Sequence, residues 1–129
     1  MKILLIEDDQ DLIVLYGRWL KSMGHEYQVC DNGFQAGMHI LKQSDEHNFE
    51  MIITDLRLPG KSGEELIDFL TTLESGHDKT PILVLSGFID EEVKKKFKKK
   101  TYIYYLEKPI DKGTLDETLE NILKSEQGT

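Results

Sequence analysis

Cysteine, proline and long apolar runs are all scarce in this sequence. The 129 residues include one cysteine, Cys30, and three prolines. A lone cysteine excludes an internal disulfide framework, and its place in an alternating stretch favours a small core residue over a reactive thiol. No apolar run is long enough to span a membrane, and Glu7 follows the N-terminal run too early for a secretory signal. These absences favour a protein of the reducing cytoplasm without a membrane partner.

Positively charged residues are also few relative to acidic ones. The 16 lysines and arginines face 24 aspartates and glutamates, which gives a formal net charge of -8. This balance argues against nucleic acid as a partner, because phosphate backbones are held mainly by net positive surface. The length suits one domain with a substantial core, which we expect over residues 1–124, with a frayed tail at residues 125–129.

Two sequence patterns alternate regularly along the chain. Short apolar or alternating runs, typical of strands, stand at residues 3–6, 27–29, 51–53, 82–85 and 102–106. Apolar residues at helical spacing follow each run, at residues 12–23, 34–41, 66–73, 89–97 and 115–123. This alternation predicts a single doubly wound α/β domain, in which a five-stranded parallel sheet lies between two layers of helices.

Polar residues follow the predicted strands at the ends where parallel sheets collect ligands. Glu7 and Asp8 come after the first strand, Asp55 ends the third, Ser86 ends the fourth and Lys108 follows the last. Because these strand ends share one rim, we expect the side chains to lie together. Crowded carboxylates require a cation, and oxygen donors without His or Cys suit Mg²⁺. A metal, an ammonium and a hydroxyl around one carboxylate suit a transferring phosphoryl group.

Each of these residues has a simpler explanation when it is taken alone. Glu7 and Asp8 could cap a helix, and Asp55 could belong to a turn. Ser86 precedes a glycine, which is a turn signal, and Lys108 alone is typical of a solvated lysine. Convergence of all of them on one rim favours a site. Asp9 by contrast is expected to stand at a helix start, where negative charge is favourable.

Four motifs resemble those of the receiver domains of two-component response regulators, in order and spacing over essentially the whole chain. They are Ile6-Glu7-Asp8-Asp9, Thr54-Asp55-Leu56-Arg57-Leu58-Pro59-Gly60 with Gly63 beyond it, Leu85-Ser86-Gly87, and Tyr105-Leu106-Glu107-Lys108-Pro109. The resemblance implies a flavodoxin-like fold with strand order 2-1-3-4-5. It also implies that Asp55 is phosphorylated by a histidine kinase or a phosphotransfer protein. Such a protein is a phosphoacceptor rather than an enzyme, and catalyses at most its own phosphorylation and dephosphorylation.

The same resemblance assigns roles to the residues around Asp55. Asp8, Asp55 and the backbone carbonyl of Arg57 would hold Mg²⁺, and Glu7 would act through water. The ammonium of Lys108 would pair with the phosphoryl group. Lys108-Pro109 would form a cis peptide bond, which proline makes accessible.

The resemblance further implies a switch and a means of setting the lifetime of the phosphorylated state. The Ser86 hydroxyl would move in to bind phosphoryl oxygens, and the Tyr105 ring would rotate into the space that it leaves. Arg57 and Phe88 stand two residues beyond Asp55 and Ser86, and both are large. We expect them to hinder the attacking water and to lengthen the phosphorylated lifetime.

If these 129 residues are the whole product, signalling is expected to occur by docking, since they include no DNA-binding output domain. The alternative is that the chain is a piece of a larger regulator. The expected surface is formed by the fourth helix, the fifth strand and the fifth helix, on a monomer or a weak phosphorylation-dependent dimer. Residues 94–100 form a lysine-rich segment in this acidic chain. They indicate either a solvated helix with Glu91-Lys95 and Glu92-Lys96 pairs, or a basic surface for an acidic partner.

Three other functions compete with this interpretation. A receiver-like interaction module that is never phosphorylated would keep the fold but not the chemistry. An aspartate-nucleophile phosphatase would use Asp55, but commonly has a second acid two residues later, where this chain has Arg57. A flavin mononucleotide binder would need a first loop that attracts phosphate, whereas the acids at residues 7–9 would repel it without a metal.

Overall fold

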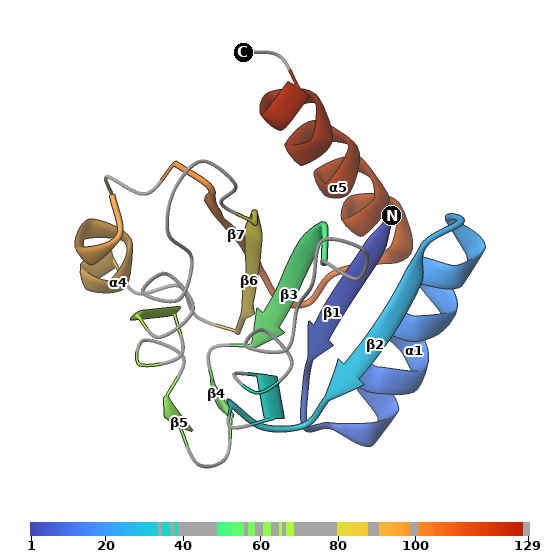
Figure 1. Cartoon of the computed structure of the whole chain (residues 1–129), viewed down its shortest axis with the longest axis horizontal. Helices are drawn as coiled ribbons and strands as arrows, with labels where there is room; N and C mark the ends of the chain where they lie inside the picture. The colour runs from blue at the N-terminus through green and yellow to red at the C-terminus, as the bar shows by residue number, and fades with distance from the viewer. Residues whose placement is uncertain are drawn as a thin grey trace.

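Five parallel strands form the sheet of this protein (Figure 1). In the computed structural model they are β1 (Lys2–Ile6), β2 (Glu26–Cys30), β3 (Met51–Asp55), β6 (Ile82–Ser86) and β7 (Ile103–Glu107). Their order across the sheet is β2-β1-β3-β6-β7, and all neighbouring pairs are parallel. Since β6 and β7 are the fourth and fifth strands of this sheet along the chain, the predicted order 2-1-3-4-5 is confirmed.

The structure describes residues 1–33, 35–36, 38, 49–55, 57–58, 61–62, 65, 67–68, 80–87, 91–98 and 101–127. The second and third predicted helices fall only partly within these ranges. Residues 35–36 and 67–68 are helical, and Ala36 and Ile67 are buried in the core. Of the apolar positions predicted for these two helices, Ile67 is buried as predicted, whereas Met38 is 55% exposed and its predicted place in a buried stripe is wrong. The other predicted positions of these two stripes lie outside the described residues.

Burial follows the sequence pattern of each strand. Every residue of β6 is buried, as are the apolar residues of β1 and β3, because helices cover both faces of these central strands. Strand β2 lies at one edge and alternates between exposed and partly buried residues before Cys30, as its sequence predicts. Strand β7 forms the other edge, where Ile103 is buried and Glu107 is exposed.

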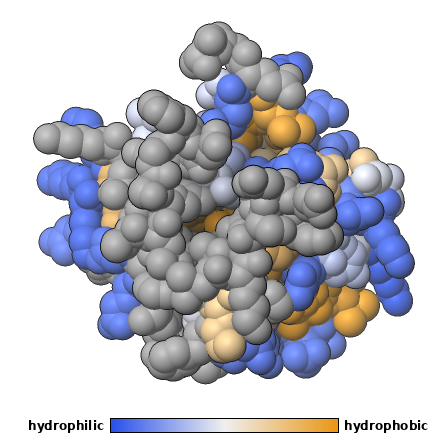
Figure 2. All heavy atoms as spheres, in the orientation of Figure 1, coloured by the Kyte–Doolittle hydropathy of each residue, from blue (hydrophilic) through white to orange (hydrophobic). Residues whose placement is uncertain are grey.

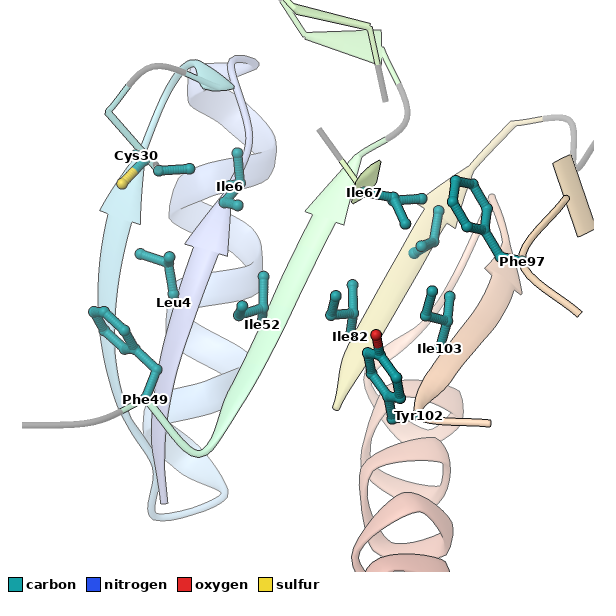
Figure 3. Close-up of a cluster of buried hydrophobic side chains, with 12 residues drawn as sticks. Leu4, Ile6, Cys30, Phe49, Ile52, Ile67, Ile82, Phe97, Tyr102 and Ile103 are labelled. Carbon is teal, nitrogen blue, oxygen red and sulfur yellow. The ribbon is translucent and has the colours of Figure 1, made fainter. Parts of the chain in front are cut away.

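Two hydrophobic layers sandwich the sheet. Helices α1 (Gln10–Ser22) and α5 (Lys112–Gln127) pack on one face, where Tyr16, Leu20 and Leu119 meet the strand side chains. The opposite face carries a second cluster, drawn in Figure 3, which includes Ile67, and Phe97 just beyond α4 (Glu91–Lys96). Helices α1 and α5 lie behind the sheet in that view. Helices on both faces confirm the doubly wound α/β fold.

Helix α1 is fixed at its start and along its length by local contacts. Asp9 is the N-cap, since its Oδ1 accepts hydrogen bonds from the backbone N–H groups of Asp11 at 2.9 Å and Leu12 at 3.2 Å. Gly17 brings α1 close to β2, because a Cβ added there would overlap the Tyr27 hydroxyl and lie 2.7 Å from Cζ of the same ring. The expectation that Asp9 serves the helix start is confirmed.

Helix α5 is capped by Asp111, whose Oδ1 accepts a hydrogen bond of 2.7 Å from the backbone N–H of Thr114. The helix continues to Gln127, past the predicted domain boundary at residue 124, and the Tyr104 hydroxyl donates to Glu126 Oε1 at 2.8 Å. The last turn of α5 is thereby attached to β7. Of the helices described, none combines the length and apolar character that crossing a bilayer requires.

Candidate functional site

The polar residues picked out by the sequence meet at one rim of the sheet. Asp55 ends β3 opposite the penultimate residue of β6, and Ser86 ends β6 opposite Glu107 of β7. Glu7 directly follows β1, and Lys108 directly follows β7. The strand register therefore delivers all these residues to the same edge, as parallel pairing predicts.

Lys108 links the two most buried carboxylates of this rim. Its Nζ lies 2.7 Å from Asp55 Oδ2 and 3.3 Å from Glu7 Oε1. The backbone N–H of Lys108 donates to the Ser86 carbonyl oxygen at 2.7 Å, and the Lys108-Pro109 bond is cis, as predicted. Burial would lower the pKa of Lys108, but the hydrogen bond and charge of Asp55, helped by the charge of Glu7, raise it. The side chain is therefore a stable ammonium at this site.

Three carboxylates form the acidic part of the rim. Glu7, Asp8 and Asp55 each place one carboxylate oxygen within 4.8 Å of the others. Glu7 is only 2% exposed, and burial raises its pKa, against the opposing charge of Lys108 and together with the charge of Asp55. Its Oε2 accepts a hydrogen bond of 3.0 Å from the backbone N–H of Asp8. One ammonium among three carboxylates leaves an excess of negative charge, which favours a further cation.

The donor set fits a hard divalent cation. The potential ligands in the described residues are all carboxylates, and such oxygen donors suit Mg²⁺ rather than zinc or copper. Asp8 is exposed and Asp55 is partly buried, so water has access to complete a coordination shell. The carboxylates that the sequence predicts around Mg²⁺ are thus brought together, with Glu7 deepest.

The remaining predicted residues lie around this cluster. The backbone of Arg57 belongs to β4 (Arg57–Leu58), which pairs with β5 (Lys61–Ser62) in a short antiparallel hairpin that the sequence analysis did not predict. Ser86 is buried at the end of β6. The Arg57 side chain and Phe88 lie outside the described residues.

Tyr105, the predicted switch residue, occupies the same side of the sheet as the cluster in Figure 3. Its ring packs against that cluster, and Lys94 Nζ lies 5.8 Å from the ring centroid. Its hydroxyl is buried, and no hydrogen-bond partner for it is found in the described structure. Burial raises the pKa of this phenol.

One residue near the rim, Tyr16, was not considered for the site in the sequence analysis. Tyr16 lines a cavity of about 460 Å³ with Leu12, Leu15, Lys108, Pro109 and Ile110. In the sequence Tyr16 belongs to the apolar stripe of α1, which predicts a residue of the hydrophobic core. The available signal was its polar tip, since a phenol hydroxyl in a buried stripe requires a polar neighbour.

The fold and this rim together define a receiver domain. The family model for the response regulator receiver domain matches residues 3–120 of the chain. The chain therefore belongs to the response regulator receiver domain family, the signal-receiving component of two-component systems. The resemblance inferred from the four motifs is confirmed.

Similar proteins include transcriptional regulators and a chemotaxis response regulator. The transcriptional regulatory protein MalR of Bacillus subtilis is 31% identical over 112 residues, which are 86% of this chain and 45% of MalR. The cell cycle transcriptional regulator CtrA of Caulobacter vibrioides is 32% identical over 128 residues, which are 99% of this chain and 52% of CtrA. The chain thus spans about half the length of these curated relatives. The solved structure of the chemotaxis response regulator CheY4 of Vibrio cholerae superposes with a TM-score of 0.80 at 26% identity, covering 94% of this chain and 97% of CheY4.

Proposed function

We propose that this receiver domain accepts a phosphoryl group on Asp55 from a histidine kinase or a phosphotransfer protein, in a Mg²⁺-dependent reaction. The observation that carries the proposal is the 2.7 Å ion pair between Lys108 Nζ and Asp55 Oδ2, beside the carboxylates of Glu7 and Asp8. A partly buried carboxylate next to a fixed positive charge suits nucleophilic attack on an anionic phosphoryl donor. The domain is a phosphoacceptor and catalyses at most its own phosphorylation and dephosphorylation.

The transfer exchanges one bond to phosphorus for another. An Asp55 carboxylate oxygen forms the new bond, the phosphorus–nitrogen bond of the donor breaks, and the electron pair leaves with the donor imidazole. Asp8, Asp55 and the backbone carbonyl of Arg57 would hold Mg²⁺, with Glu7 acting through water. When bound, the ion supplies positive charge that offsets the charge of the phosphoryl oxygens. Lys108 turns its ammonium from Asp55 to one of those oxygens.

Ser86 and Tyr105 form the proposed switch. The Ser86 hydroxyl moves toward the phosphoryl group and donates a hydrogen bond to it, and the Tyr105 ring turns into the space left behind. An unpaired buried hydroxyl is unfavourable. Because the Tyr105 hydroxyl has no hydrogen-bond partner among the described residues, this supports a second ring orientation in which the hydroxyl finds one.

Arg57 and Phe88 are proposed to set the lifetime of the phosphorylated state. Large side chains two residues beyond Asp55 and Ser86 would obstruct in-line attack by water. Replacing both Arg57 and Phe88 by Ala should accelerate the decay of phosphorylated protein. An unchanged first-order decay rate in that double variant would refute this role.

The donor protein is proposed to dock beside Lys108 on helix α1. Val14 and Leu15 are 53% and 40% exposed there, although both are apolar. Leu15 also lines the cavity that contains Lys108 and Pro109. An exposed apolar surface next to the phosphoacceptor supports contact with a partner.

The output surface is proposed to lie on α4, β7 and α5 and to bind an acidic partner. Lys94, Lys95, Lys96 and Lys98 are exposed in a chain of net charge -8, and most of the coloured atoms on the left side of Figure 2, over α4, are hydrophilic. Lys96 Nζ lies 2.7 Å from Asp68 Oδ2, so part of this charge is already paired. Replacing Lys95 and Lys98 by Gln should weaken partner binding more at low salt than at high salt.

The decisive experiment is intact-mass spectrometry after exposure to acetyl phosphate, with and without Mg²⁺. The wild type should gain one phosphoryl group with Mg²⁺, Asp55→Ala should gain none, and the control Asp116→Ala on α5 should behave as wild type. No gain in the wild type would overturn the proposal and leave a phosphorylation-independent interaction module. Turnover of phosphate esters that is lost in Asp55→Asn would point instead to a phosphatase.

We also propose that the domain works in the cytoplasm, as a monomer or a weak phosphorylation-dependent dimer.

A further inference from the structure

Tyr16 occupies an unusual position for a core aromatic residue. It lies on α1 and is only 3% exposed, within the cluster that packs α1 and α5 on the sheet. Its ring centroid is 5.5 Å from that of Trp19, with the ring planes inclined by 44°. The ring is therefore held firmly, so its hydroxyl has a fixed location.

Tyr16 and Lys108 line the same cavity. Among the described residues that line the cavity of about 460 Å³ between α1 and the residues after β7, Tyr16 and Lys108 are the two with polar side-chain groups. The charges of Lys108, Glu7 and Asp55 all act on the Tyr16 phenol, whose pKa burial raises. The hydroxyl thus lies within the electrostatic field of the rim.

Among the described residues, one donor and one acceptor at this cavity wall have no hydrogen-bond partner. An ammonium has three hydrogens, and within the described structure Lys108 Nζ donates to two acceptors, Asp55 Oδ2 and Glu7 Oε1. The Tyr16 hydroxyl has no hydrogen bond to another described residue. Two groups of complementary chemistry therefore share one cavity wall without being joined.

Resting on the proposed phosphorylation of Asp55, we propose that Tyr16 is a positioning residue for Lys108. When the ammonium turns from the carboxylates toward a phosphoryl oxygen, the Tyr16 hydroxyl accepts its remaining hydrogen. This bond holds Nζ on the α1 side of the phosphoryl group and prevents its return to Glu7. In this proposal Tyr16 contacts neither Mg²⁺ nor the reacting phosphorus. It acts only through Lys108.

The test compares Tyr16→Phe with wild type, because this substitution keeps the ring and removes only the hydroxyl. Binding of beryllium fluoride, a phosphoryl mimic, is measured by ¹⁹F NMR in the presence of Mg²⁺, and Mg²⁺ binding is measured alone by calorimetry. We expect Tyr16→Phe to weaken beryllium fluoride binding and slow phosphorylation by acetyl phosphate about three- to tenfold, the effect of one solvent-accessible hydrogen bond. Mg²⁺ affinity should not change. Tyr104→Phe, which loses a hydroxyl far from the rim, is the matched control.

A double-mutant cycle with Lys108→Ala decides whether the hydroxyl acts through the lysine. Tyr16→Phe should have no further effect on beryllium fluoride binding in the Lys108→Ala background. An effect that persists there, an equal loss of Mg²⁺ affinity, or wild-type behaviour of Tyr16→Phe would each overturn the inference while leaving the proposed function intact. Failure of the wild type to bind beryllium fluoride and to accept a phosphoryl group would overturn both.

Discussion

The strongest stability prediction concerns the mutual repulsion of the carboxylates at the rim. Replacing Asp8 by Asn removes one of three negative charges whose oxygens lie within 4.8 Å of one another. In metal-free buffer the variant should unfold at a higher urea concentration than wild type, because the folded state alone forces these charges together. With Mg²⁺ the order should reverse, since Asp8 is a proposed ligand of the ion.

The expected size follows from the separation of the charges. Two unit charges 4.8 Å apart repel by about 0.9 kcal/mol in water and about 3.5 kcal/mol at an effective dielectric constant of 20. Asp8 is exposed and Lys108 offsets part of the repulsion, so we expect a gain of about 1 kcal/mol, or about 3–5 °C in melting temperature. Mg²⁺ at one hundred times its Kd should add about 2.7 kcal/mol to wild type only.

Urea unfolding followed by circular dichroism at fixed pH, with EDTA or with Mg²⁺, measures both effects. Glu117→Gln on α5 changes the net charge equally at an exposed position and should shift stability by less than about 0.5 kcal/mol. Equal stability of wild type and Asp8→Asn in EDTA would refute the repulsion. An unchanged Mg²⁺ response of Asp8→Asn would refute its role as a ligand.

Three further predictions test the packing and titration of the fold. Gly17→Ala should destabilise despite a helix-propensity gain of about 1 kcal/mol, because overlap with Tyr27 costs about 1–3 kcal/mol, and in a Tyr27→Ala background its sign in urea unfolding should reverse. Burial raises the pKa of Glu7, so its contribution to stability is present below the ordinary carboxyl pKa and is lost as pH rises through the raised value. Glu7→Gln should abolish that loss, and parallel stability curves for the two proteins from about pH 4 to pH 8 would contradict it. Tyr104→Phe removes the 2.8 Å bond to Glu126 and should speed hydrogen exchange in the last turn of α5, which unchanged protection would disprove.

The strand ends and the residues placed on them could be predicted from the sequence. Apolar runs fix the length of a buried strand, and parallel pairing then determines which residues reach the rim. Asp55 and Lys108 are far apart in the chain, but both immediately end or follow such a run. The strand pattern therefore predicts that Asp55 and Lys108 lie close together, and the 2.7 Å ion pair between them agrees with this prediction.

Other features of the site depend on side-chain packing that no local pattern records. A lysine after an edge strand has solvent as an alternative, so the sequence alone did not fix the contact of Lys108 with Glu7. Tyr16 has helical spacing with its apolar neighbours, and that periodicity describes its ring but not the direction of its hydroxyl. The Arg57–Leu58 strand is too short to carry a periodic signal, so the hairpin after Asp55 was also missed.

The burial of Cys30 has a practical consequence for following this protein in solution. The thiol is 1% exposed and burial raises its pKa to about 11, so only about one molecule in ten thousand carries a thiolate there at neutral pH. Maleimide reagents will thus modify a cysteine introduced at a surface position while leaving the natural one untouched. Fluorophores or spin labels can then be attached at chosen points without first removing a core side chain.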